Sequence, residues 1–174
     1  MRTIDINVLD QSSIQDAVNL IERYEKELPK KAESFISSLA YEASVIAQNN
    51  FNTALYAGTN DVLVEFERLS GSEYRVEASG EATLFIEYGT GVSYPENAAE
   101  IAETIGHIYP HGEYGFGFGK QASWTYRGEP GNIGESLGNG RVKTAGNPAN
   151  SSLYNAKKDV ARKAKLIAEE VFND

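Results

Sequence analysis

Apolar residues recur at helical spacing over the first third of the chain. A first stripe, between residues 14 and 28, predicts a helix that begins after a cap at Ser12 or Ser13. Pro29 disfavours a helical conformation for the residue before it, so this helix is expected to end near Leu28. Before it, residues 3–9 alternate between apolar and polar and predict a short strand or an extended arm. The stripe consists of Ile14, Ala17, Val18, Ile21, Tyr24 and Leu28.

Pro29 also suits the first turn of a helix, and a second apolar stripe follows it. This stripe predicts a longer helix over about residues 30–55, closed by Ala57-Gly58-Thr59-Asn60. A helix of that length is long for a small domain, so we expect it to lie across a sheet. The stripe consists of Phe35, Ile36, Leu39, Ala43, Ile46, Ala47 and Phe51.

Three runs of alternating apolar and polar residues come next, separated by short turns at residues 70–72 and 79–81. This pattern predicts an antiparallel β-meander with one apolar face under the long helix. The third run, Ala82 to Tyr88, has apolar side chains on both faces, and Gly89 and Gly91 end it in a forced turn. Glu87 lies just before that turn and has no evident partner in the sequence. The solvated face is expected to carry Glu65, Glu67, Glu73, Arg75 and Glu77.

Glycine and aromatic residues dominate the stretch from Val92 to Thr144. Residues 116–120 and 122–127 predict the two arms of a β-excursion. Residues 128–140 hold five glycines and one proline, which predicts a flexible loop that a partner would order.

A last helix is predicted from near Pro148 to Phe172, with Asn150 or Ser151 as its cap. It is basic in an otherwise acidic chain, and its charges form either a solvated face or a pairing surface for an acidic neighbouring subunit. The predicted fold is α+β, as one domain over residues 1–174 with parts 1–28, 30–91, 92–147 and 148–174. The cations are Lys157, Lys158, Arg162, Lys163 and Lys165.

The composition narrows the function classes. The 174 residues are 41% hydrophobic, which is enough for one domain with a core. The chain has no cysteine, which removes disulfides, thiolate metal sites and cysteine nucleophiles. A net charge of −9 disfavours nucleic-acid binding, and no run approaches the length of a membrane span. An acidic wall would suit a path that DNA passes without sticking.

No catalytic, cofactor or metal site is predicted. His107 and His111 cannot share one helix face, because Pro110 lies between them. Residues 115–120 lack the spacing of a phosphate-binding loop, and nothing singles out an acid pair for glycoside hydrolysis. The exposed aromatic residues either stack on sugars or, more simply, form an interface, because Tyr and Trp supply rigid contact area.

Two short motifs carry a resemblance to a known family. The first is Glu87-Tyr88-Gly89-Thr90, after the predicted meander. The second runs from Pro148 to Ala156 and opens the last helix. In their order, with the glycine- and aromatic-rich stretch between them, they resemble the tail-component family of long-tailed bacteriophages, the head–tail joining or tail-completion proteins. The likeness in layout extends from about Lys30 to Phe172.

The resemblance implies a structural protein of the virion neck or tail, made in the host cytoplasm, that acts as a ring subunit. The ring is expected to be a homo-oligomer, commonly six-fold, between connector and tail-tube proteins, with DNA passing through its lumen. No enzymatic activity, cofactor, membrane or sequence-specific nucleic acid is implied. The alternative is a small binding module, for carbohydrate or another ligand, that uses the aromatic excursion. Candidate interface residues are Glu87, Tyr88, Gly89, Thr90, Tyr109, Tyr114, Phe116, Phe118, Trp124, Tyr126 and Tyr154.

Overall fold

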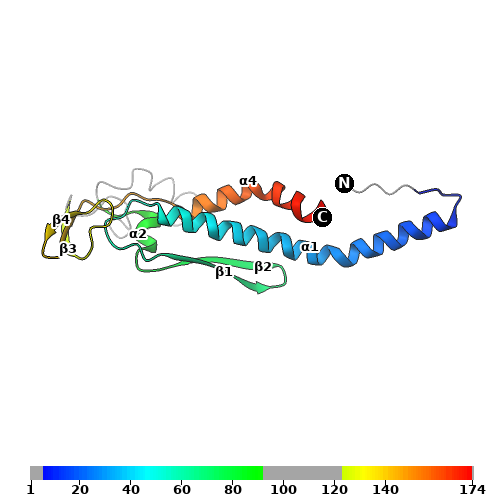
Figure 1. Cartoon of the computed structure of the whole chain (residues 1–174), viewed down its shortest axis with the longest axis horizontal. Coiled ribbons are helices and arrows are strands. Elements are labelled where there is room, and N and C mark those ends of the chain that lie inside the picture. The colour runs from blue at the N-terminus through cyan, green and yellow to red at the C-terminus, as the bar shows by residue number, and fades with distance from the viewer. Residues whose placement is uncertain (1–5, 92–122, 174) are drawn as a thin grey trace.

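The computed structural model describes residues 6–91 and 123–173, and its fold is α+β, as predicted (Figure 1). Helix α1 forms a long spine, with a β-hairpin on one side and helix α4 on the other (Figure 1). A short helix, α2, and a three-stranded sheet lie toward the C-terminal end of α1. The bounds are α1 Gln11–Asn52, β1 Leu63–Ser70, β2 Glu73–Ser79, α2 Thr83–Tyr88, β3 Trp124–Arg127, β4 Glu135–Gly138, β5 Arg141–Thr144 and α4 Ser152–Asn173.

The hydrophobic core lies where the end of α1, the base of the hairpin and α2 meet. Phe51 and Ile86 are fully buried there. Tyr56, Val64, Ala78 and Leu153 pack around this core, so α4 contributes its first turn to it. The buried residues of this cluster are Phe51, Ala54, Val62, Ala82 and Ile86.

Helix α1 is continuous, and the prediction of two helices divided at Pro29 is wrong. Pro29 has no N–H to donate to the carbonyl of Glu25, but both residues are exposed, so water can satisfy that carbonyl.

The N-terminal cap of α1 is Asp10, and not Ser12 or Ser13 as predicted. The Asp10 carboxylate accepts the N–H of Ser12 (2.9 Å) and its hydroxyl (2.8 Å), and these hydrogen bonds lower the pKa of Asp10. Residues 6–9, in the predicted strand or arm, form no strand.

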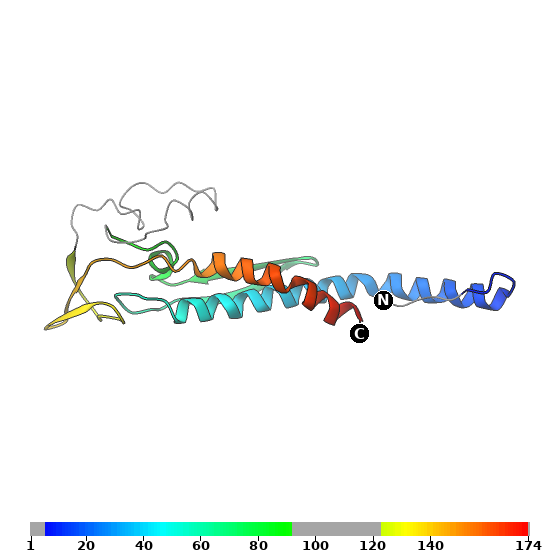
Figure 2. The same ribbon diagram turned by 90° about the horizontal axis from the view of Figure 1, so that it is seen from above.

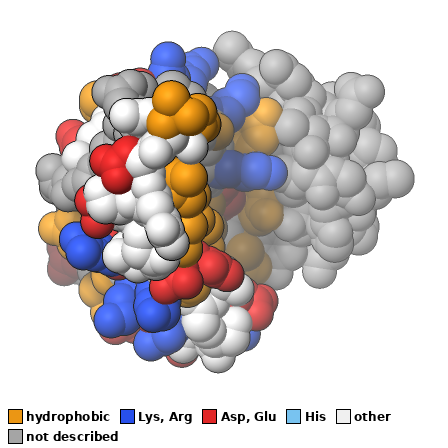
Figure 3. All heavy atoms as spheres, turned by 90° about the vertical axis from the view of Figure 1, so that its right-hand side faces the viewer, with side chains coloured by type: hydrophobic (Ala, Val, Ile, Leu, Met, Phe, Trp, Pro, Cys, Tyr) orange, Lys and Arg blue, Asp and Glu red, His pale blue; other side chains and the backbone are white. Residues whose placement is uncertain are grey.

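Residues 11–30 of α1, which we call the stem, extend beyond both α4 and the hairpin (Figure 2). Helix α1 meets α4 at Lys31, whose Nζ donates to the carbonyl of Val171 (3.2 Å), and at Phe35, whose ring centroid lies 5.9 Å from that of Phe172. Apart from Ala17, which is buried, the stem's apolar stripe is open to solvent, and hydrophobic side chains gather along one side of this end (Figure 3). The exposed fractions are 43% for Ile14, 41% for Val18, 54% for Ile21, 45% for Tyr24 and 41% for Leu28.

The hairpin of β1 and β2 is antiparallel, and the predicted turn at residues 70–72 connects its strands. As predicted, its apolar face lies toward α1, while the charged side chains of the other face are exposed. The hairpin is not part of a three-stranded meander, because residues 83–88 form helix α2 and not a third strand.

Helical spacing explains why this segment is not a strand. Thr83, Ile86 and Glu87 share one helical face, and all three are buried. The carboxylate of Asp61 accepts the N–H groups of Glu81 (2.8 Å) and Ala82 (2.9 Å), which satisfies the chain at the start of α2. The period-two pattern of apolar residues was therefore misleading over so short a segment.

The C-terminal part of the predicted excursion is a sheet in the order β3-β5-β4, antiparallel throughout. Residues 122–127 were expected to form a β-arm, and residues 124–127 do so as β3. The prediction of a flexible loop over residues 128–140 is wrong for residues 135–138, which form β4. Its glycines serve the turn instead: Gly138 and Gly140 have positive φ beside Asn139, which also has positive φ. The other predicted arm, residues 116–120, lies outside the described residues.

Candidate functional site

The two motif segments meet at what we call the α2–α4 junction, formed by residues 86–91 and 146–154. Oε2 of Glu87 accepts the N–H of Leu153 (3.0 Å), and Oε1 accepts the N–H of Tyr154 (3.2 Å). These are the second and third residues of α4, whose N–H groups have no acceptor within the helix. Glu87 thus performs the capping that the sequence assigned to Asn150 or Ser151.

The backbone at the junction completes a reciprocal arrangement. The N–H of Asn150 donates to the carbonyl of Ile86 (2.8 Å), and that of Ser151 donates to the carbonyl of Glu87 (3.0 Å). Ser151 has a φ of 52°, in the left-handed region that a serine adopts rarely. The loop before α4 therefore satisfies the end of α2, while α2 satisfies the start of α4.

Burial controls the charge state of Glu87, which is 5% exposed. Burial raises the pKa of Glu87 above its ordinary value of 4.5, and the N–H groups of Leu153, Tyr154 and Ser152 partly oppose the rise. This carboxyl is a structural cap with an altered proton affinity, and no second acid or histidine of the described residues contacts it through a hydrogen bond or ion pair.

Asn147 links the junction to the end of α1. Its Oδ1 accepts the N–H of Ala57 (2.7 Å), and its Nδ2 donates to Oγ1 of Thr90 (2.9 Å). The backbones of Thr90 and Asn147 also form an isolated antiparallel bridge. A Cβ on Gly146 would lie 2.0 Å from the carbonyl oxygen of Thr90, so only glycine permits this approach. The turn after residue 88 therefore serves close packing between two chain segments.

Asn50 and Asn150 attach the same junction to α1. Nδ2 of Asn50 donates to the carbonyl of Ser152 (3.1 Å), and Nδ2 of Asn150 donates to the carbonyl of Asn50 (2.9 Å). Sequence reasoning missed both of these contacts and the role of Asn147. The available signal was the density of asparagines around Pro148, which is typical of side chains that bond to the backbone.

An open aromatic cleft of about 620 Å³ lies beside the junction, between α2 and the loop after α1 (residues 56–61) on one side and β3 on the other. Burial raises the pKa of both Tyr56 and Tyr126, and the hydroxyl of Tyr126 donates to the carbonyl of Glu129 (2.8 Å). The lining includes the aromatic residues Tyr56, Phe85, Trp124 and Tyr126, the acids Asp61, Glu81 and Glu129, and Arg127.

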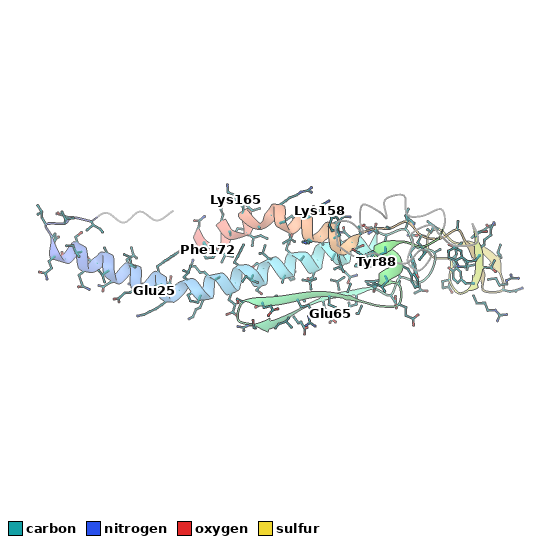
Figure 4. All side chains as sticks on the ribbon, turned by 180° about the vertical axis from the view of Figure 1, so that it is seen from behind. Glu25, Glu65, Tyr88, Lys158, Lys165 and Phe172 are labelled. Carbon is teal, nitrogen blue, oxygen red and sulfur yellow. The ribbon has the colours of Figure 1, made fainter. Side chains whose placement is uncertain are left out.

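The structure thus divides the predicted interface residues into groups. Glu87, Gly89, Thr90 and Tyr154 come together at the junction, and Tyr88 lies in α2 beside it (Figure 4). Trp124 and Tyr126 belong to the aromatic cleft, and Thr90 lines it as well. Four of the predicted residues lie outside the described residues: Tyr109, Tyr114, Phe116 and Phe118.

Within residues 6–91 and 123–173, no three His, Cys, Asp or Glu side chains group in a way that would hold a metal ion. No helix in those residues is long and apolar enough to cross a bilayer. No protein-family model, curated protein or solved structure matches this chain.

Replacing Glu87 by alanine leaves two N–H groups at the start of α4 without their acceptor. We expect Glu87→Ala to lower the free energy of unfolding by about 1–3 kcal/mol, measured by urea denaturation. Glu81→Ala removes an exposed acid just before α2, the helix that carries Glu87, and is the matched control, with an expected change below about 0.5 kcal/mol. Equal stabilities of the two variants would contradict the capping role.

The pH dependence of the unfolding free energy of Glu87→Gln, compared with that of the wild type, tests the charge state of Glu87. Because burial raises the pKa of Glu87, the folded protein binds this proton more tightly than the unfolded chain does. The resulting stabilisation is complete at pH values below the pKa that Glu87 has in the unfolded chain. It is lost as pH rises through the higher pKa that Glu87 has in the folded protein. The unfolding free energy of the wild type minus that of Glu87→Gln should therefore fall as pH rises from about 4, then level off. A difference that grows with pH would mean that hydrogen bonds from the N–H groups lower the pKa of Glu87 by more than burial raises it.

Proposed function

We propose that this chain is a structural virion protein of a long-tailed bacteriophage or prophage, which joins the head connector to the tail or completes the tail as a ring subunit. The observation that carries the proposal is the α2–α4 junction. The two motifs of the family resemblance are far apart in sequence, yet Thr90 bridges Asn147 and Glu87 caps the helix that the second motif opens. Both motifs therefore serve packing, as in an assembly protein, and the proposal assigns no catalytic residue.

The stem supports an assembling role. Most helical stability in proteins comes from tertiary packing, yet five of the six apolar residues of the stem's stripe remain 41–54% exposed, and only Ala17 is buried. Burying that stripe against other subunits would stabilise the stem by about 25 cal/mol for each Å² of apolar surface removed from water. The elongated shape and the open stripe together favour a protein that is completed by its neighbours.

The aromatic cleft favours a second candidate, a carbohydrate-binding module. Trp124, Tyr56 and Tyr126 line the cleft beside acidic side chains, a combination that suits stacking on sugar rings. Titration with cell-wall glycans would then shift the fluorescence of Trp124, the only tryptophan of the chain. An unchanged spectrum across a broad panel removes this candidate.

The ring proposal predicts concentration-dependent assembly of the purified protein. Native mass measured across concentration, with imaging of the large species, should show closed rings or short tubes. Ile21→Glu, which places a charge in the stem stripe, should weaken assembly without changing the circular dichroism of the monomer. Asn19→Glu adds the same charge at an exposed stem position outside the stripe and should assemble as the wild type does.

A strict monomer at every concentration would contradict a ring that the chain forms by itself. Equal assembly of Ile21→Glu and Asn19→Glu would remove the stem from the interface.

A further inference from the structure

The outer face of α4, which we call the basic face, carries Lys158, Arg162 and Lys165 with one acid, Glu169, and Lys157 lies at its edge; all five are exposed. Arg162 pairs with Asp159 (3.0 Å), and Lys165 reaches Glu169 only at 3.9 Å, with its side chain 89% exposed. Such pairs within one exposed helix contribute little. Lys163 differs, because it pairs with Glu42 of α1. Lys157 and Lys158 form no ion pair with any described residue, although Nζ of Lys158 lies 4.5 Å from the centroid of the Tyr154 ring. The four cations outnumber Asp159 and Glu169, so this side of α4 keeps a net positive charge.

The outer face of the hairpin, which we call the acidic face, has the opposite sign. It consists of Glu65, Glu67, Glu73 and Glu77, with Arg75 as its one cation. Arg75 lies 3.3 Å from Glu67 and 3.8 Å from Glu77. Glu65 is directly opposite Glu77 in the strand register, and like charges in that position destabilise a hairpin. A cationic partner on this face would relieve the repulsion.

The two faces cannot pair within one chain. Lys158 and Lys165 lie along α4, and Glu65 lies on the hairpin on the other side of α1 (Figure 4). A second copy of the chain, however, can place its α4 against this hairpin. Contacts between two different faces of identical subunits repeat head to tail, and they close into a ring when the rotation permits.

We propose that the basic face of one copy docks on the acidic face of the next copy, and this inference rests on the proposed ring function. The two surfaces match in size: α4 is about 33 Å long and the hairpin strands about 25 Å. Each charged face also has exposed apolar neighbours that add contact area, Leu166 on α4 (57% exposed) and Leu63 on β1 (54% exposed).

Charge reversal on each face provides the test. One variant carries Lys158→Glu and Lys165→Glu, and the other carries Glu65→Lys and Glu77→Lys. Each variant alone opposes like charges across the interface, so the concentration needed for assembly should rise at least about tenfold. In an equimolar mixture, every α4 meets a hairpin of opposite charge when the two variants alternate, so assembly should return. A single chain that carries all four substitutions should also assemble.

Arg127→Glu with Arg141→Glu is the matched control for the α4 variant, because it makes the same change in net charge at exposed positions of the three-stranded sheet. It should assemble as the wild type does, and circular dichroism should show all variants folded. If the wild type forms rings and both charge-reversed variants form them equally well, the docking surface is wrong and the ring proposal stands. If the wild type itself never assembles, the ring proposal and this docking surface fail together.

Discussion

The buried carboxylate of Glu87 is the constraint on which the arrangement of α2, α4 and the spine depends. A carboxylate taken out of water needs hydrogen-bond donors, and the start of α4 supplies the N–H groups of Leu153 and Tyr154. The same contact satisfies a helix end that would otherwise lie near the core without an acceptor. Asn147, Asn150 and Asn50 extend the arrangement from the junction to α1, so one hydrogen-bond network fixes where α4 begins.

Once α4 is fixed there, the rest of the shape follows. Phe172 packs on Phe35 near the other end of α4, so α4 covers the C-terminal half of the spine and does not reach the stem. The hairpin covers the other side and reaches the spine with its tip, where Arg68 pairs with Glu33 (2.7 Å). The chain therefore presents three different surfaces: an apolar stem, a basic helix face and an acidic hairpin face. Complementary surfaces on opposite sides of one subunit are the physical requirement for head-to-tail assembly.

The sequence predicted elements whose pattern is local and long. The stripe from Leu153 to Val171 defined α4, and the alternation around the Ser70-Gly71-Ser72 turn defined the hairpin. Local patterns gave the wrong secondary structure where contacts with residues far away in the sequence determine the conformation. The six residues of α2 alternate like a strand, but they form a helix. Glu87 is buried there because its carboxylate accepts the N–H of Leu153, 66 residues further along the chain. Pro29 was given too much weight, since an exposed stem tolerates a missing backbone hydrogen bond. Of the candidate site, the pattern indicated Glu87 to Thr90 but not the asparagines that hold them.

The central claim is that identical subunits join through α4 and the hairpin. Disulfide cross-linking tests it most directly, because the chain has no cysteine of its own. A variant with Ala161→Cys on the outer side of α4 and Ser79→Cys on the outer side of the hairpin should oxidise into a ladder of dimers, trimers and larger species that ends at the closed ring. Single-cysteine variants should give no ladder. A double-cysteine variant that remains monomeric, or that stops at a dimer, would contradict head-to-tail assembly.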